Sequence, residues 1–205
     1  MRRLAIETAT EACSVALFDN GRLIGHAHEL VGRGHAERLI PMIADLPERG
    51  QADEIIVDCG PGSFTGVRVG LAAARALGFA WAAPVRGYSS LSLVAALVAV
   101  ERPDLHRVAV AIIGGHGEYF VQLFETRPVL ALTPLASLKP DAAAQLCGGA
   151  VLAGSGADAV RAAGAVGDAL HLYPDARGTG LLTPELAALP PSPIYGRAPD
   201  ARLPG

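Results

Sequence analysis

Charged side chains are scarce in this 205-residue chain: they make up 18% of it, and 17 Lys and Arg against 20 Asp and Glu leave a net charge of −3. Without a basic surplus there is no broad electrostatic attraction for phosphate backbones, so we expect no binding of nucleic acid by the chain alone. Hydrophobic residues make up 51%, which excludes a disordered chain. The composition predicts one ordinary globular domain or two small lobes.

Long apolar runs are also absent. The longest apolar stretch, residues 91–100, has about half the length that a helix needs to cross a bilayer, and Glu101 closes it. The first residues include Arg2 and Arg3, as a signal peptide would, but Glu7 interrupts the apolar region that a signal peptide requires. We therefore expect no membrane segment and a cytoplasmic protein.

Metal-ligand and disulfide patterns are missing too. Three widely spaced cysteines without a Cys-x-x-Cys pair indicate neither a disulfide framework nor a thiolate metal site; they are Cys13, Cys59 and Cys147. His26 and His28 share one face of an expected strand, but no third ligand accompanies them. His35 is followed four positions later by Leu39, so no His-x-x-x-His pair forms on that helix. We expect no metal site.

The order of elements repeats. In the first half the patterns predict strands at 4–6, 14–18, 23–29 and 54–59, and helices at 67–81 and 89–100. A helix before the fourth strand has one apolar stripe at i, i+3, i+4 and i+7; its members are Leu39, Met42, Ile43 and Leu46.

The second half predicts strands at 108–113, 119–125, 129–132 and 151–153, a helix after Asp141 and another from Ala157. We therefore expect an α/β protein of two lobes, each a mixed sheet with packed helices. The first lobe should span residues 1–103 and the second, smaller and partly degenerate, residues 104–205.

A glycine-rich loop at residues 60–66 lies between a predicted strand and a predicted helix. Such a loop can present backbone N–H groups to a phosphate, although it matches neither the Walker A nor the Rossmann pattern. The alternative is that its glycines only permit a tight turn. Glu7 and Asp58 end neighbouring strands and could bind a metal–phosphate or share a proton, or be merely structural. The candidate phosphate- or nucleotide-facing residues are Glu7, Thr8, Gly60, Gly62, Ser63, Thr65 and Arg68.

The helix after the loop has a small residue at every fourth position, and these residues are Gly66, Gly70, Ala74 and Gly78. Each glycine in a helix interior costs up to about 1 kcal/mol relative to alanine. A compensating gain is close backbone approach. The pattern leaves open whether the approaching backbone belongs to the chain's own sheet or to a helix of another chain.

Four segments, at residues 4–17, 35–43, 60–71 and 193–201, together resemble the bacterial TsaB (YeaZ) family. The resemblance implies a two-lobed actin-like (RNase H-like) fold. It implies a non-catalytic scaffold that pairs with TsaD and the ATPase TsaE for threonylcarbamoyl transfer to a tRNA adenosine beside the anticodon. It also implies that tRNA is reached only through the complex, and we expect a homodimer when the chain is alone.

The resemblance further implies no catalytic residue and no cofactor in the isolated chain, and it leaves open a site for ATP or ADP at the interface of the complex. The segment 113–118 departs from the family pattern, as does Glu7, where the family has Asp. The predicted contact residues for TsaD, or for a second copy, are His35, Leu39, Met42, Ile43, Gly66, Val69, Gly70, Ala73 and Ala74. Two alternatives remain open: a metallopeptidase-like enzyme of the glycoprotease type, and an actin-like kinase or ATPase.

Overall fold

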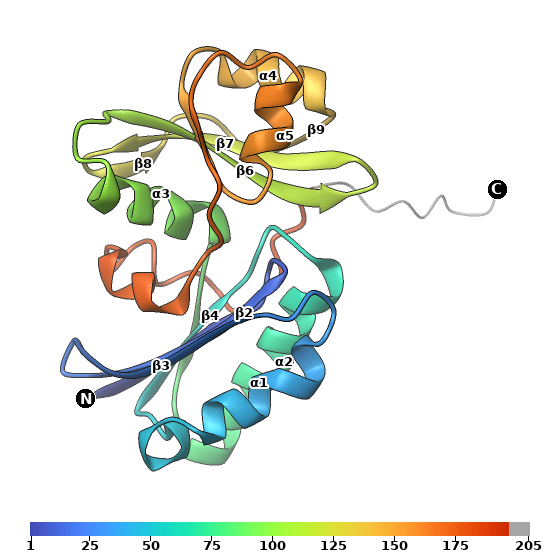
Figure 1. Cartoon of the computed structure of the whole chain (residues 1–205). Helices are drawn as coiled ribbons and strands as arrows, with labels where there is room; N and C mark the ends of the chain where they lie inside the picture. Colours follow the sequence, from blue (N-terminus) through green and yellow to red (C-terminus); the bar gives the residue numbers. More distant parts are fainter. Residues whose placement is uncertain (197–205) are drawn as a thin grey trace.

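The first sheet of the computed structural model, which describes residues 1–196, has the strand order β3-β2-β1-β4-β5 (Figure 1). Its strands are β1 (Arg2–Glu7), β2 (Ala12–Asp19), β3 (Arg22–Leu30), β4 (Glu54–Asp58) and β5 (Val85–Tyr88). The first three are antiparallel, and β4 and β5 continue the sheet parallel to β1. Asn20 and Gly21, both at positive φ, form the β2–β3 turn, as their sequence predicts.

Two helices cover one face of this sheet: α1 (His35–Ala44) and α2 (Phe64–Trp81), with a short 3₁₀ turn, η1 (Pro47–Gly50), after α1 (Figure 1). The predicted apolar stripe of α1 is confirmed, because Leu39, Met42, Ile43 and Leu46 are all buried in the core of this lobe. α2 begins three residues earlier than the sequence pattern predicts, since Ser63 caps its first turn.

The second sheet repeats the first. Its order is β11-β10-β6-β7-β8, and β9 pairs with β7. β6, β7 and β8 are antiparallel, and β10 and β11 run parallel to β6, so each of these five strands has a counterpart in the first lobe, and β9 is additional. The predicted duplication is confirmed. The strands are β6 (Arg107–Gly115), β7 (Glu118–Thr126), β8 (Val129–Ala131), β9 (Ala136–Leu138), β10 (Val151–Ala153) and β11 (Ala169–Leu170).

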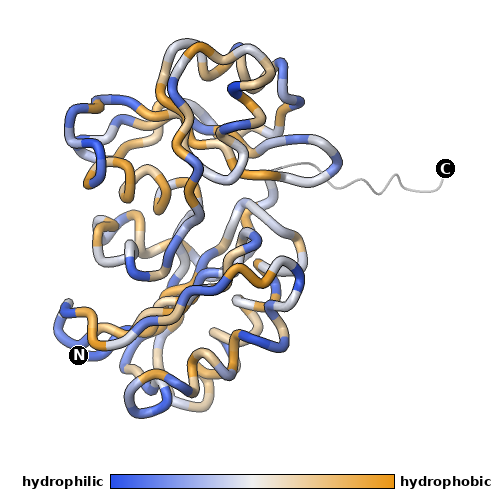
Figure 2. The backbone as a smooth tube through the Cα atoms, viewed as in Figure 1, coloured by the Kyte–Doolittle hydropathy of each residue, from blue (hydrophilic) through white to orange (hydrophobic). Residues whose placement is uncertain are grey.

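The outer face of the second sheet is covered by α4 (Pro140–Cys147) and α5 (Ala157–Ala162), and its inner face by α3 (Ser90–Glu101) (Figure 1). Figure 2 shows apolar residues along α3, which packs into the core of the second lobe with β6 and β7. The 3₁₀ helix η2 (Ala176–Leu181) covers the inner face of the first sheet. The first sheet ends at Tyr88 and the second begins at Arg107, so the predicted boundary at residue 103 stays a prediction. α3 follows the first sheet in the chain but packs on the second, and η2 follows the second sheet but packs on the first.

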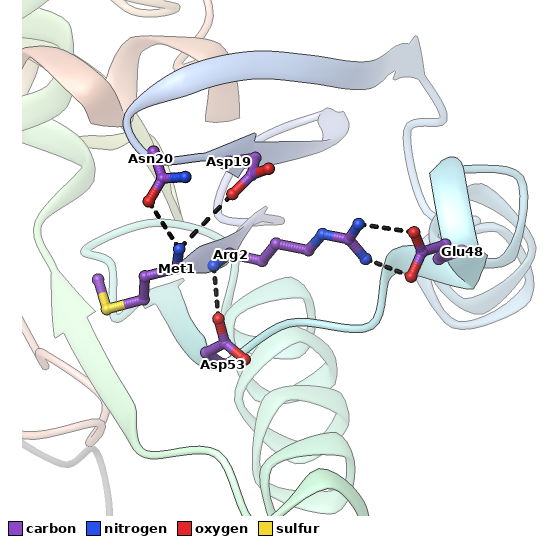
Figure 3. Close-up of polar contacts among 6 residues, drawn as sticks. All are labelled: Met1, Arg2, Asp19, Asn20, Glu48 and Asp53. Carbon is purple, nitrogen blue, oxygen red and sulfur yellow. Dashed lines mark hydrogen bonds and ion pairs between the residues drawn. The ribbon is translucent and has the colours of Figure 1, made fainter.

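Polar contacts fasten β1 at the edge of the first lobe (Figure 3). The Arg2 guanidinium forms a two-bond ion pair with Glu48, and its backbone N–H donates to Asp53 Oδ2 at 2.7 Å. The Met1 amine donates to Asn20 Oδ1 at 2.7 Å. These bonds connect the hairpin turn and η1 to the same strand.

Across residues 1–196, none of the helices has the length and apolarity needed to span a membrane. Residues 197–201 of the segment that resembles the family's closing stretch lie outside the described residues.

Candidate functional site

A cleft between the two lobes forms the main cavity, with a volume of about 1410 Å³. The first lobe contributes the segments that follow β1 and β4, at residues 9–11 and 62–69. The second lobe contributes the β6–β7 turn at residues 113–116, and residues 193–196 close one side. In open α/β sheets, ligands bind outside the carboxyl ends of the strands, which is where this cleft lies.

The glycine-rich loop at one wall of the cleft is held by its own lobe. The Ser63 N–H donates to the Ala9 carbonyl oxygen at 2.6 Å, and Ser63 Oγ accepts from the Gly66 N–H at 3.2 Å. A Cβ at Gly62 would overlap the Ala9 carbonyl, and Gly60 has a φ of +90°. The turn alone therefore accounts for these two glycines and for Ser63. Whether the exposed side of the loop, with Thr65, faces a phosphate stays a prediction.

Glu7 and Asp58 meet behind this loop and are completely buried. Glu7 Oε1 accepts from the Ala9 N–H at 2.8 Å, and Oε2 lies 3.1 Å from the Tyr88 hydroxyl. Asp58 Oδ1 accepts from the Gly60 N–H at 2.5 Å. The prediction that Glu7 faces a phosphate or nucleotide is therefore wrong, because its carboxyl group is enclosed by the lobe.

The two carboxyl groups influence each other's pKa. Burial raises the pKa of Asp58 to about 7, and burial together with the neighbouring Asp58 raises the pKa of Glu7 well above its ordinary value. Asp58 Oδ2 is buried and has no hydrogen-bond partner within residues 1–196. Two adjacent buried carboxyls cannot both ionise at low cost. Of the alternatives that the sequence left open, the complete burial of both carboxyls disfavours a metal–phosphate, whereas proton sharing and a structural role both stay predictions.

Thr8 is also directed inward, which corrects a second prediction for the loop. Its side chain is buried, and Oγ1 donates to the Gly66 carbonyl oxygen at 2.8 Å. A Cβ at Gly66 would overlap the Thr8 carbonyl oxygen, and a Cβ at Gly70 would overlap Thr8 Oγ1. A Cβ at Gly78 would likewise overlap the Val85 side chain of β5, with Cγ2 at 2.5 Å. The small-residue stripe therefore lets α2 lie flat on its own sheet, and its use as a seam with another chain is wrong.

The predicted partner contacts on α1 and α2 fall largely inside the lobe. His35 is buried, and its Nε2 lies 3.2 Å from the Ala12 carbonyl oxygen. Only Val69 and Ala73 are half-buried. The other members of the predicted contact set are buried and have no surface to offer; besides His35 they are Leu39, Met42, Ile43, Gly66, Gly70 and Ala74.

The surface that these helices do expose is a different one. Three alanines of α2 spaced by four, together with a 93% exposed Phe79 and a half-exposed Ile40 of α1, lie on the outer side. The alanines are Ala72, Ala76 and Ala80. Sequence reasoning missed them, although a second apolar stripe on a helix whose first stripe already covers a sheet is a recognisable signal.

Other candidate ligands remain dispersed. Across the described residues, no three His, Cys, Asp or Glu side chains gather in a way that could hold a metal ion. His26 and His28 lie exposed on β3. Arg68, by contrast, lines the cleft as predicted; its Cζ lies 3.2 Å from the centroid of the Phe64 ring, and Nη2 donates to the Tyr195 hydroxyl at 3.0 Å.

Comparison with known proteins agrees with this architecture. The family model of tRNA N6-adenosine threonylcarbamoyltransferase (TsaD) matches residues 24–129. YeaZ from Pseudomonas aeruginosa superimposes with a TM-score of 0.77 at 30% identity, over 95% of this chain and 99% of that one. The chain belongs to the TsaB (YeaZ) family.

Further relatives show the same membership. TsaB of Escherichia coli is 39% identical over 125 residues, 58% of this chain and 53% of that protein. A second Pseudomonas aeruginosa structure, described as similar to the peptidase YeaZ, has a TM-score of 0.81 at 29% identity over 96% of this chain and 99% of that one. The match spans about half the length of the curated TsaB relatives. The predicted two-lobed actin-like fold is confirmed.

Proposed function

We propose that this chain is the non-catalytic scaffold and activator subunit of a cytoplasmic tRNA-modifying complex. In this role it pairs with a TsaD-type transferase, and with TsaE, for threonylcarbamoyl transfer to a tRNA adenosine next to the anticodon. It contacts tRNA only through the complex. The observation that carries the proposal is the 39% identity, over 125 residues, to a protein named for tRNA threonylcarbamoyladenosine biosynthesis.

The enclosure of the acidic pair supports a role without catalysis in this chain. A general acid or base must come within hydrogen-bond reach of the group it serves. Glu7 and Asp58, the carboxyls next to the cleft loop, are fully buried and bonded within the lobe. Their hydrogen bonds connect β1 and β4 to the backbone of the segments that follow these strands.

The outer surface of α1 and α2 is the proposed contact for TsaD, and for a second copy when TsaD is missing. Small alanine side chains allow a partner backbone to approach closely, and Phe79 offers an apolar anchor. Val69 and Ala73 adjoin this surface and stay in the proposed contact set.

The experiment is a calorimetric titration of the full chain with its cognate TsaD, using Ala76→Glu and the matched control Ala159→Glu on the exposed side of α5. We expect Ala76→Glu to weaken binding at least about tenfold, because a carboxylate would be buried against apolar surface. Ala159→Glu should bind as the wild type does. If the wild type does not bind TsaD, the proposed function is wrong; if all three bind equally, only the surface is wrong.

A titration with ATP, with and without TsaD, tests the remaining alternatives. We expect no heat of binding from the isolated chain, and heat that appears only with TsaD would locate a nucleotide at the subunit boundary. ATP binding by the chain alone would favour an actin-like kinase. A stoichiometric metal in the purified chain would favour a peptidase-like enzyme.

A further inference from the structure

An arginine at the mouth of the cleft uses only part of its guanidinium group. Arg68 lies with its guanidinium over the Phe64 ring, and Nη2 donates to the Tyr195 hydroxyl at 3.0 Å. Nη1 is buried and has no hydrogen-bond partner within residues 1–196. Burying an unpaired donor costs free energy, and the cost is larger for a charged group. The side chain is therefore held in place with donor capacity left over.

The acceptor for Nη2 comes from a C-terminal strap, residues 189–196, which runs between the lobes (Figure 1). The strap is fastened below Tyr195: the Ile194 N–H donates to the Cys59 carbonyl oxygen at 2.7 Å, and Arg75 Nη2 donates to a strap carbonyl oxygen at 2.6 Å. Tyr195 itself is 61% exposed. Its side chain can therefore leave Arg68 while the strap stays in place.

We infer that Arg68 is a receptor for an oxyanion, carboxylate or phosphate, and that the Tyr195 hydroxyl occupies its place until the anion arrives. A neutral hydroxyl satisfies one guanidinium nitrogen. An anion with two oxygens matches the planar fork with two parallel charge-assisted hydrogen bonds, which are about twice as strong as neutral ones. The Phe64 ring fixes the plane of the fork, and the cleft beside it has room for the ligand.

The charged neighbours favour a small anion. Besides Arg68, the cleft is lined by Arg33, Glu11 and Glu37, so its charge is nearly balanced. Glu11 Oε2 already accepts from the Tyr173 hydroxyl at 3.1 Å. Attraction is thus local to Arg68 and does not extend over the whole cleft. This receptor is a property of the chain alone and does not depend on the proposed function.

The test titrates the full chain with inorganic phosphate and, separately, with acetate. Nuclear magnetic resonance follows the Arg68 side-chain N–H resonance and the backbone N–H resonances of the neighbouring residues 64–69, and the backbone resonances report binding in the Arg68 variants as well. We expect a saturable shift of the Arg68 resonance. Tyr195→Phe removes the competing hydroxyl and keeps the ring, so it should tighten binding about fivefold. Arg68→Gln should abolish the saturable response, and Arg68→Lys, which keeps the charge without the fork, should weaken it. The control Arg161→Gln, on α5, should respond as the wild type does.

Comparing phosphate with acetate distinguishes the two kinds of anion that Arg68 could bind. A response to phosphate alone assigns a phosphate-bearing ligand, a response to acetate alone assigns a carboxylate, and a response to both supports their shared chemistry. The inference is overturned if Arg68 shows no saturable shift in either the wild type or Tyr195→Phe. It is also overturned if Arg68→Gln or Arg68→Lys leaves the response unchanged. None of these outcomes bears on the proposed function, which the titration with TsaD tests separately.

Discussion

The two lobes have the same strand order but differ at the strand ends that face the cleft. In the first lobe, β1 and β4 end in Glu7 and Asp58, two buried carboxyls whose pKa values are both raised. In the second lobe, the counterpart strands have no carboxyl group at this place. Ala153, the last residue of β10, is buried, and a Cβ at Gly154 would overlap the Ala111 carbonyl oxygen. The second lobe forms the same strand order with no acid at Ala153 or Ala111, so the topology does not require the acids of the first lobe.

The helices that follow these strand ends differ as well. α2 has 18 residues and α5 has 6. Gly66, in the first turn of α2, lies against the Thr8 carbonyl oxygen, whereas Gly156, before α5, has the edge of the Tyr119 ring as its nearest neighbour. Close packing against backbone leaves no freedom to adjust, but a ring can turn aside. The contact at Gly66 is therefore less adjustable than the contact at Gly156, and α2 also has a long outer surface.

The pH dependence of stability should come from the first lobe. The pKa of Asp58 is about 7 when folded, above its unfolded value, so the folded chain binds more protons and its stability falls as pH rises towards 7. Asp58→Asn can still accept from Gly60 and cannot ionise. It should flatten the profile between pH 4 and pH 8 by about 4 kcal/mol, because the pKa difference is about three units. Unfolding curves across this range measure the effect, and parallel profiles for the two proteins would contradict it.

Paired alanine substitutions should show the next largest difference between the lobes. Gly66→Ala forces a Cβ onto the Thr8 carbonyl, which is fixed in β1's continuation, and should lower the free energy of unfolding by about 3 kcal/mol. Gly156→Ala meets mainly a half-buried ring and should cost about 1 kcal/mol. Urea unfolding measures both. If both variants lost the same free energy of unfolding, the contact at Gly66 would be no less adjustable than the contact at Gly156.

The smallest effect should appear where the lobes meet. A Cβ at Gly178 of η2 would lie 2.7 Å from Leu97 Cδ2 of α3, whereas one at Gly180 would have ordinary contact with Phe18. Gly178→Ala should cost about 1 kcal/mol because the leucine side chains can yield partly. Gly180→Ala, the matched control, should be near neutral. Thermal unfolding compares them, and a larger loss for Gly180→Ala would refute the tight packing of η2 on α3.

Local signals recovered most of the fold. The Asn20–Gly21 turn, the buried stripe of α1 and the repeated order of strands are fixed by neighbours in sequence, and the structure confirms each. The placement of α3 and η2 was not predictable, because both follow one lobe in the chain and pack on the other. For the site, the loop and Arg68 were identified, but the inward direction of Glu7 and Thr8 was not.

The amino-acid pattern by itself determined which residues pack closely and which elements they form, because hydrophobic periodicity and turn chemistry act over a few residues. The spacing of Gly66 and Gly70 predicted that another backbone approaches α2 closely, but it did not identify that backbone. Only the tertiary structure decided that this neighbour is β1 and the segment after it, since a missing Cβ reports contact distance and carries no information about which backbone fills the space. The same holds for Glu7: a carboxyl at a strand end is equally suited to a ligand or to a buried partner, and the position of Asp58 decides between them.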